Sequence, residues 1–436
     1  MSRPLSATAA AAARTAIYQR TSGPSPEIPG LVYCAVNKQG ESIFNHASGN
    51  TALGGTAPMT LDTTFWLASC TKLITAIAAM QLVERGKLAL DDSDQLELFA
   101  PELRDVQVLE RTSAGGFQLV PKERRITLRM LLTHTGTSVP KYTRSKTADY
   151  FEAGFGYAFE DAKLRGWSLP IGLDDFLGHR SDILHRPLVN QPGTKFQYGT
   201  GMDWAGAVVE RVAGMSLEAY FQTFIFGPLG IKNMRFFPTP DMRGTLATMH
   251  QRDKDGVLRT RDHLLRLPLL PCAARADEDR FCMGGCGCFG TPLEYCRILA
   301  AILNDGCSPH TGAKILKSET VKEMFTDQIP TMPIKVNEYT PTGKPEIANP
   351  TPLMPGPEDL TEGWGLSFSL SHVQSPTGRA AGSASWEGVA NLFWFADREN
   401  GIGGIIASQI LPYGDLEVVK CSGEVERIIY DDLVRR

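Results

Sequence analysis

The amino-acid sequence predicts an α/β fold of the α+β kind, in which a central antiparallel sheet is flanked by helices. Two β-rich segments joined by a turn lie within residues 30–50, and further β-rich segments follow after about residue 360. Between them, residues 90–245 show mainly helical patterns, separated by loops that contain proline and glycine. One sheet built from both ends of the chain, with a helical region inserted in its middle, is the simplest architecture with this order.

The N-terminal elements follow from short patterns. Residues 1–20 are rich in alanine and predict an amphipathic helix, with an acid-free transit peptide as the alternative. The segment GLVYCAV is rich in strand formers, NKQG is a turn, and the chain returns through SIFNH, so a hairpin is expected over 30–50. Apolar residues then recur at helical spacing from Leu73 to Met80, and Gly86 is suited to end that helix.

Two further helices are well marked. Val208, Val209 and Val212 form an apolar stripe on a helix that Gly214 ends. A second helix, over 292–304, begins with a proline at a position where helices accept it. The remaining expectations are a proline-rich surface loop at 330–358, strands at 363–370, 390–397 and 402–410, and a final helix within 414–436.

Composition excludes several function classes. The 436 residues carry a formal net charge of −4, which gives no electrostatic case for binding nucleic acid or an anionic membrane. No segment approaches the 18 or so apolar residues that span a bilayer. The nine cysteines, an odd number without a signal peptide, indicate reduced thiols and a cytoplasmic protein. Cys282, Cys286 and Cys288 lack paired C-x-x-C spacing, so small side chains in a glycine-rich turn explain them better than a metal site.

The stretch WLASCTKLITAIAAM places Ser69 and Lys72 three residues apart at the start of a helix. That spacing is about one helical turn, so both side chains point the same way. The helix N-terminus favours a developing negative charge, and a lysine removed from water can accept the proton of the serine. The spacing therefore predicts a nucleophile and its base, although a helix-capping serine beside a solvated lysine explains the spacing alone equally well.

Other arrangements for nucleophilic catalysis are weaker. A second S-x-x-K, SVPK at 138–141, contains a proline that opposes a helical turn. Cys70 lies about 100° around the helix from its neighbour and would miss the face of Lys72. His134 is better explained as a helix-end residue that holds loops together than as a base.

Five segments, in order between about residues 28 and 412, resemble the serine β-lactamase and penicillin-binding superfamily in its class C and esterase branch. They are SCTK, MLLTHTG, NQPGTKFQYGTGMDWAG, GGCGCFGTPLEYCRILAAILNDG and GSASWEGVANLFWFADRENG. Within this branch the chain is most similar to fungal acyltransferases of polyketide pathways, of the lovastatin-transesterase type. The resemblance implies the β-lactamase/transpeptidase-like fold, with a sheet domain of residues 1–90 and 246–436, an inserted helical domain of residues 91–245, and the active site between them.

The resemblance also implies a mechanism. Ser69 attacks an ester or thioester carbonyl, Lys72 and Tyr198 share its proton, and the backbone N–H groups of Ser69 and Val389 hold the oxyanion. A neighbouring ammonium favours the phenolate that makes a tyrosine a usable base. No metal or organic cofactor is required. The residues expected to contact the substrate are Thr200, Trp386, Glu387 and Gly388.

Two motifs depart from the lactamase pattern. Tyr198-Gly199-Thr200 lacks the asparagine of Y-x-N, and Trp386 stands where K-T-G has a lysine that helps to hold the carboxylate of a β-lactam. Both changes argue against efficient antibiotic hydrolysis, since tryptophan offers only an apolar face and one N–H donor. Glu387 replaces the usual small residue, and its role stays open.

We therefore expect a serine acyltransferase, a transesterase that moves an acyl group from a thioester or ester donor through acyl-Ser69 to an alcohol of a small secondary metabolite. A carboxylesterase that hydrolyses small esters is the alternative. A β-lactamase and a non-catalytic small-molecule-binding relative are less favoured. An acyl carrier domain of a synthase is a candidate donor, and we expect a monomer without nucleic-acid or membrane partners.

Overall fold

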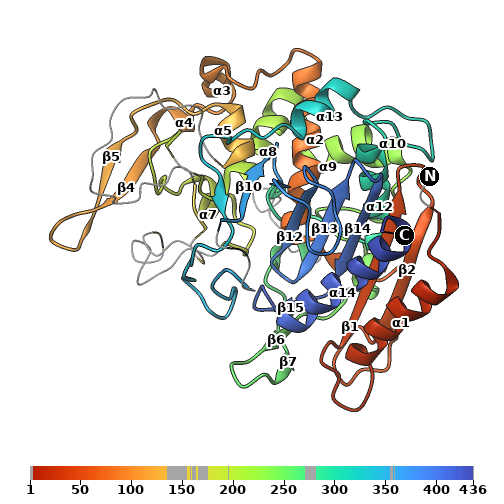
Figure 1. The fold of residues 1–436 in the computed structure, drawn as a ribbon. Coiled ribbons are helices and arrows are strands. Elements are labelled where there is room, and N and C mark those ends of the chain that lie inside the picture. Colours follow the sequence, from red (N-terminus) through yellow and green to blue (C-terminus); the bar gives the residue numbers. More distant parts are fainter. Residues whose placement is uncertain are drawn as a thin grey trace.

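A computed structural model of the chain describes residues 3–134, 155–157, 159, 164, 175–194, 196–270, 281–353, 357 and 359–435. Its centre is an eight-stranded antiparallel sheet with the order β2-β1-β14-β13-β12-β11-β10-β9 (Figure 1). The strands are β1 Gly30–Asn37, β2 Ser42–Gly49, β9 Ile334–Lys335, β10 Thr361–Trp364, β11 Ser369–Ser371, β12 Ala384–Gly388, β13 Leu392–Asp397 and β14 Ile402–Ala407.

The N-terminal hairpin joins the C-terminal strands directly. Strand β1 pairs with β14, with Val32 opposite Ala407 and Tyr33 opposite Ile406. The predicted sheet built from both ends of the chain is thereby confirmed. All eight residues of β1 and all six of β14 are buried, because helices cover both faces of the sheet at this point.

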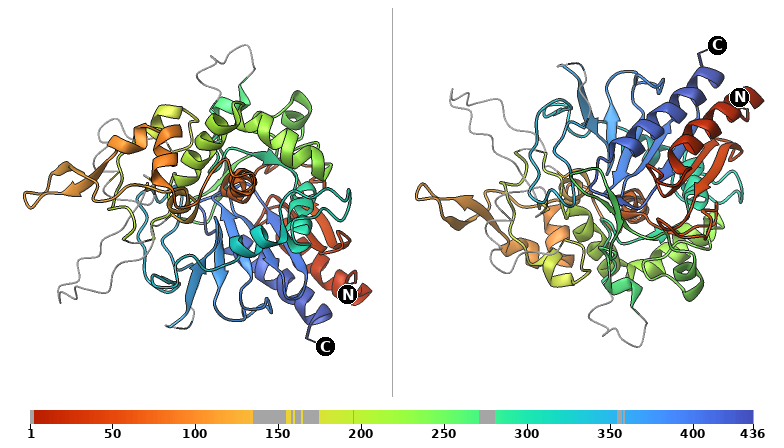
Figure 2. Two further views of the ribbon diagram at one scale, coloured as in Figure 1. Left: turned by 90° about the horizontal axis from the view of Figure 1, so that it is seen from above. Right: turned by 90° about the horizontal axis from the view of Figure 1, so that it is seen from below.

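One face of the sheet carries helices α1 (Ala7–Thr21) and α14 (Leu416–Leu433), which lie side by side (Figure 2). Helix α1 buries Ala13, Ala16 and Ile17, which share one side at helical spacing, so the predicted N-terminal helix is confirmed. Its amphipathic character is not, because apolar residues are distributed around the helix with little preference for one face. The two chain ends are tied together, since the backbone N–H and hydroxyl of Ser6 donate to the Asp432 carboxylate over 3.0 and 2.8 Å.

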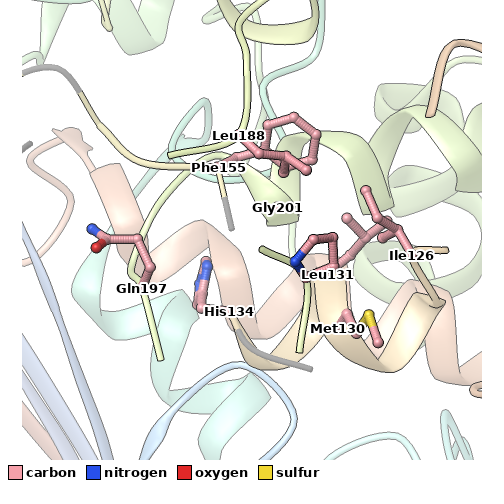
Figure 3. A pocket seen from close by; sticks show the side chains of 9 residues that line it. Ile126, Met130, Leu131, His134, Phe155, Leu188, Gln197 and Gly201 are labelled. Atoms are coloured by element: carbon pink, nitrogen blue, oxygen red, sulfur yellow. The ribbon is translucent and has the colours of Figure 1, made fainter. Parts of the chain in front are cut away.

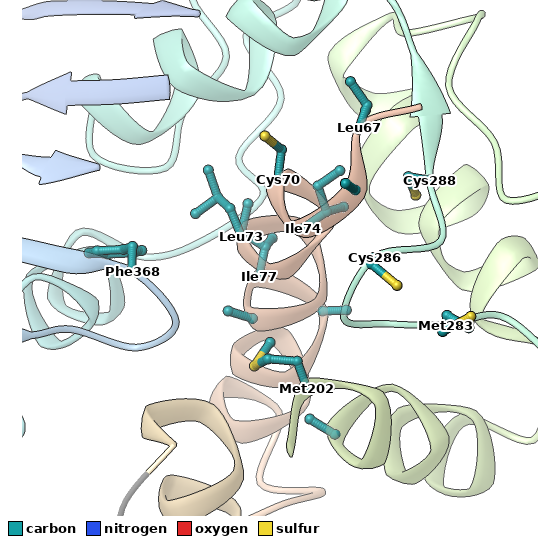
Figure 4. Packing of buried hydrophobic residues seen from close by; sticks show 14 of the residues in the cluster. Leu67, Cys70, Leu73, Ile74, Ile77, Met202, Met283, Cys286, Cys288 and Phe368 are labelled. Carbon is teal, nitrogen blue, oxygen red and sulfur yellow. The ribbon is translucent and has the colours of Figure 1, made fainter. Parts of the chain in front are cut away.

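The opposite face of the sheet is covered by α12 (Pro292–Leu303) and α2 (Thr71–Glu84). Every residue of α2 from Thr71 to Leu82 is buried, so this helix forms the centre of the larger core (Figure 4). A helix that is enclosed on all sides contacts partners all round. Helix α8 (Gly201–Ala213) is one of them, and it ends at Gly214 as predicted.

The remaining elements surround these layers. Helices α3 Ser93–Phe99, α4 Glu102–Asp105, α5 Leu128–Thr133, α7 Arg180–Leu184, α9 Leu217–Phe221, α10 Gly227–Leu229, α11 Pro240–Gly244 and α13 Ser318–Met324 are short. Three small sheets pair β3 Phe65–Trp66 with β8 Phe289–Gly290, β4 Gln107–Arg111 with β5 Phe117–Pro121, and β15 Ile410–Leu411 with β6 His250–Arg252, which also pairs with β7 Leu258–Thr260. No described helix is both long and apolar enough to cross a membrane.

Two expectations differ from the structure. The segment 363–370, expected as one strand, is split between β10 and β11, because Ser367 takes a left-handed conformation (φ 84°) that turns the chain back on itself. The region expected to be mainly helical contains the β4–β5 hairpin, whose strands pair across the turn TSAGG. The division into a sheet domain and an inserted domain of residues 91–245 stays a prediction.

Candidate active site

Ser69 lies in a tight turn, Ala68–Cys70, directly before α2. Ala68 is in the left-handed region (φ 46°), which is strained for a residue with a side chain and is found where surrounding contacts enforce it. The Thr71 hydroxyl donates to the Ala68 carbonyl over 2.7 Å and accepts the Cys288 N–H over 3.1 Å. These contacts hold the turn so that Ser69, which is 8% exposed, opens onto a cleft.

The Lys72 ammonium is fully buried below the serine. It donates to Ser69 Oγ over 3.0 Å, to the Tyr157 hydroxyl over 3.2 Å and to the Gly285 carbonyl over 2.9 Å. Three acceptors match the three N–H groups of an ammonium, so the charge is solvated by the protein. The alternative that the spacing alone left open, a lysine exposed to water, is therefore wrong for Lys72.

Tyr198 approaches the serine from the other side. Its hydroxyl donates to Ser69 Oγ over 2.7 Å and accepts the Trp386 Nε1–H over 3.1 Å. Lys72 Nζ lies 4.5 Å from the centre of the tyrosine ring. The structure thus brings Ser69, Lys72, Tyr198 and Trp386 into one hydrogen-bonded group, although they come from three distant parts of the chain.

Sequence reasoning missed two buried residues next to this group. Tyr157 is one of the acceptors of Lys72, and burial raises the pKa of its hydroxyl well above the usual value. Asp203, on α8, accepts the Gly285 N–H over 2.9 Å; burial raises its pKa, and the charge of Lys72 acts in the opposite direction. Asp203 follows Tyr198 within the segment NQPGTKFQYGTGMDWAG, so the sequence offered a signal that could have pointed to it. The segment FGYAF around Tyr157 matches no pattern, so the sequence offered no signal for Tyr157.

The glycine-rich segment passes close to α8, as predicted for the turn that contains the cysteines. A Cβ on Gly285 would lie 2.5 Å from the Asp203 carboxylate, and one on Gly284 would lie 2.7 Å from the Met202 carbonyl. Cys282, Cys286 and Cys288 are buried, and burial raises the pKa of each thiol. Among the described residues, no group of three or more His, Cys, Asp or Glu side chains is arranged to hold a metal.

The cleft in front of Ser69 has a volume of about 640 Å³ and opens to solvent. Aromatic rings form most of its wall, which suits an apolar acyl chain. Polar groups enter it at Glu387 and at Tyr413, whose hydroxyl donates to the Glu387 carboxylate. The lining residues are Ser69, Tyr157, Phe159, Phe176, Tyr198, Thr351, Trp386, Glu387, Val389 and Tyr413.

Two expected substrate contacts lie elsewhere. Thr200 is fully buried at the start of α8, where its N–H donates to the Phe155 carbonyl, and it does not line the cleft. Gly388 is buried at the end of β12, where a Cβ would approach the Leu67 carbonyl to 2.9 Å. Its lack of a side chain lets this strand pack against the turn that carries Ser69, which brings Val389 to the cleft.

The alternatives to Ser69 fare differently. Cys70 points into the core (Figure 4), and burial raises the pKa of its thiol, so the unreactive neutral form dominates. The second S-x-x-K, at 138–141, lies outside the described residues. His134 ends α5 in a left-handed conformation (φ 54°), and its backbone carbonyl accepts the Gln197 N–H over 2.8 Å, while the role of its side chain stays a prediction. His134 and Gln197 also line a second, smaller pocket of about 320 Å³ (Figure 3).

An antiparallel sheet covered by helices, with a serine at a helix start and a buried lysine one turn later, defines an active-serine enzyme of the S-x-x-K class. The chain belongs to the β-lactamase family, whose sequence model matches residues 18–419.

Relatives cover nearly the whole chain. A lovastatin esterase of Penicillium rubens is 34% identical over 89% of this chain and 91% of its own length. A monacolin J acid methylbutanoyltransferase of Aspergillus terreus is 31% identical over 93% of this chain and 92% of its own. The unliganded simvastatin synthase LovD of Aspergillus terreus superposes with a TM-score of 0.78 at 27% identity, covering 99% of this chain and 100% of that one. The predicted resemblance and fold class are confirmed.

Proposed function

We propose that this protein is a serine acyltransferase, which moves an acyl group from a thioester or ester through an acyl-Ser69 intermediate to an alcohol of a small molecule. The observation that carries the proposal is the convergence of the Lys72 ammonium and the Tyr198 hydroxyl on Ser69 Oγ, at 3.0 and 2.7 Å. The names of the relatives, which are acyltransferases and an esterase, agree with this chemistry.

In the proposed mechanism Ser69 attacks the donor carbonyl while its proton passes to the pair formed by Tyr198 and Lys72. The oxyanion is held by the backbone N–H groups of Ser69 and Val389, and such donors are worth on the order of 10²–10³ in rate each. The leaving thiol or alcohol takes the proton. In the second half the acceptor alcohol attacks the acyl-serine, and the same pair removes its proton and returns it to the departing Ser69 Oγ, so that Ser69 is regenerated.

Hydrolysis is the second candidate, favoured by the esterase among the relatives. Transfer to alcohol needs a cleft that disfavours water, and the aromatic wall around Ser69 supports this. We further propose that the protein acts as a monomer in the cytoplasm and that its donor is a thioester on an acyl carrier domain.

The test combines two measurements. Mixing the protein with acyl thioesters and recording its intact mass should reveal one acyl group on Ser69. Adding a panel of bulky secondary alcohols should then give more ester than free acid. Free acid as the sole product across the panel would select the esterase, and no adduct with any donor would reject both.

A further inference from the structure

The cleft contains one carboxyl group that the proposed mechanism does not use. Glu387 is the middle residue of Trp386-Glu387-Gly388 at the end of β12. It lines the same cleft as Ser69. Its carboxylate accepts a hydrogen bond from the Tyr413 hydroxyl, which lies at the cleft as well. A carboxylate in an aromatic cleft is stabilised by hydrogen-bond donors or a cation, since burying an unpaired charge is unfavourable.

No cation of the described residues forms an ion pair with Glu387. On β10, Glu362 accepts a hydrogen bond from Ser369 and repels the Glu387 carboxylate. Arg379 acts in the opposite direction but is paired with Glu426, 2.9 Å away on α14.

The other polar side chains at the cleft are the hydroxyls of Ser69, Tyr157, Tyr198 and Thr351, with the Lys72 ammonium below Ser69 and Tyr157. Lys72 donates its three N–H groups to Ser69, Tyr157 and Gly285. Burial raises the pKa of the Glu387 carboxyl to about 7, the Tyr413 hydrogen bond lowers it, and Glu362 raises it.

We propose that Glu387 is a specificity residue of the cleft: its carboxylate binds a hydroxyl or ammonium group of the substrate, and it rejects substrates that carry a carboxylate at that place. Tyr413 orients the carboxylate by its hydrogen bond. This inference rests on the proposed function and deepens it, because it names the substrates as neutral or cationic. Two unit charges of the same sign about 6–12 Å apart, at an effective dielectric constant near 20, repel enough to lower affinity roughly 10- to 100-fold.

The test measures the ratio of kcat/KM for a neutral substrate to kcat/KM for a matched substrate with a carboxylate, so that effects on the chemical step cancel. One arm compares two acyl donors of equal length, the p-nitrophenyl ester of pentanoic acid and the mono-p-nitrophenyl ester of glutaric acid. The other arm compares two acceptors, a hydroxy acid and its methyl ester, with one thioester donor. In the wild type at pH 8.5, where Glu387 is ionised, the neutral member should exceed the carboxylate member in kcat/KM by at least 10-fold in one arm. Glu387→Gln should bring that ratio to within about 3-fold of unity.

The pH dependence gives a second readout. As the pH falls through the raised pKa of Glu387, about 7, the carboxylate becomes protonated and tolerates a second carboxylate; as the pH rises through it, the ionised form rejects one. The ratio of neutral to carboxylate substrate should therefore rise between pH 6 and 8 in the wild type and stay flat in Glu387→Gln. The substrate carboxylate is ionised throughout this window.

Two variants of residues that act on Glu387 should shift the pH at which the ratio rises, and they should shift it in opposite directions. Tyr413→Phe removes the hydrogen bond that lowers the pKa of Glu387, so the rise in the ratio should shift to higher pH. Glu362→Gln, a matched control outside the cleft lining, removes a repulsion, so the rise should shift to lower pH. A general structural disturbance would not produce opposite shifts.

The inference can fail separately from the proposed function. Equilibrium binding of the same esters to Ser69→Ala, measured by calorimetry, needs no turnover and should show the same preference. Ratios in both arms that are unchanged by Glu387→Gln, or equal binding of neutral and carboxylate members, would overturn the role of Glu387. Absence of an acyl-enzyme with a normal binding preference would instead overturn the acyltransferase.

Discussion

The indole N–H of Trp386 donates a hydrogen bond to the hydroxyl oxygen of Tyr198 over 3.1 Å. The tyrosine in turn donates to Ser69 Oγ, so tryptophan supports the candidate base directly and does more than line the cleft. A neutral N–H donor therefore occupies the position that a lysine holds in the lactamase motif. It can stabilise a phenolate, but it supplies no charge for a substrate carboxylate.

Removing the nucleophile should abolish the covalent intermediate. Ser69→Ala should form no acyl adduct and show no turnover, with the free energy of unfolding nearly unchanged, because one small hydroxyl is lost. Intact-mass spectrometry and chemical denaturation measure the two effects. Cys70→Ala is the control, since Cys70 points into the core and should leave the adduct in place. An adduct on Ser69→Ala would disprove the assignment.

Lys72 and Tyr198 should act as one unit, because both contact Ser69 Oγ and the ammonium lies 4.5 Å from the tyrosine ring centre. Lys72→Ala and Tyr198→Phe should each lower kcat by roughly 10²–10⁴. The double variant should be little slower than the slower single variant. Losses that multiply fully in this double-mutant cycle would mean that the two residues do separate work.

Trp386→Phe should lower kcat by about 2- to 10-fold, the range of one net hydrogen bond, and leave KM for an apolar ester nearly constant because the aromatic face remains. Trp394→Phe is a matched control. Trp394 lies opposite Trp386 in the sheet, and its buried Nε1–H has no hydrogen-bond partner among the described residues. That change should affect stability without changing kcat. Equal losses of kcat in both variants would reject the proposed hydrogen-bond effect.

β-Lactams should be poor substrates. Trp386, whose N–H is donated to Tyr198, supplies no positive charge for their carboxylate, and Glu387 adds a negative charge to the same cleft. We expect kcat/KM for a chromogenic cephalosporin to be orders of magnitude below that for a short-chain acyl ester, because an unpaired buried charge costs several kcal/mol. An equal rate on the cephalosporin would contradict our interpretation of the third motif.

A buried ion pair contacts the aromatic wall of the cleft. Arg186 Nη1 lies 2.8 Å from Asp175 Oδ1 with both side chains fully buried, and Asp175 also accepts the Phe159 N–H over 3.0 Å. Arg186→Met should lower the free energy of unfolding by about 3–5 kcal/mol, since it removes one partner of a buried ion pair. It should also raise KM, because Phe159 lines the cleft.

The control for that change is a pair at the surface. Asp431→Asn removes the partner of Arg435, where both side chains are largely exposed, and should alter the free energy of unfolding by less than about 1 kcal/mol. Urea denaturation of both variants measures the difference. A loss for Arg186→Met no larger than that for Asp431→Asn would show that the buried pair does not hold the wall.

Local patterns in the sequence were sufficient to predict the main helices and the Ser69–Lys72 pair. The spacing of Ser69 and Lys72 defines one helical turn, and hydrophobic periodicity located α2 and α8, because helical geometry depends on neighbours along the chain. Helix α12 was located by the proline at its start. The order of β-rich and helical segments was enough to predict a sheet shared by both ends. The resemblance in short motifs then singled out Tyr198 and Trp386.

Only the tertiary structure decided what meets at the serine. Tyr157 and Asp203 flank Lys72 through the packing of distant segments, which no local spacing encodes. The same packing removed Thr200 from the cleft and brought Tyr413 to Glu387, although Glu387 and Tyr413 are 26 residues apart. The protonation behaviour of these groups follows from desolvation, and the extent of desolvation depends on the folded surroundings of each side chain rather than on its neighbours in sequence.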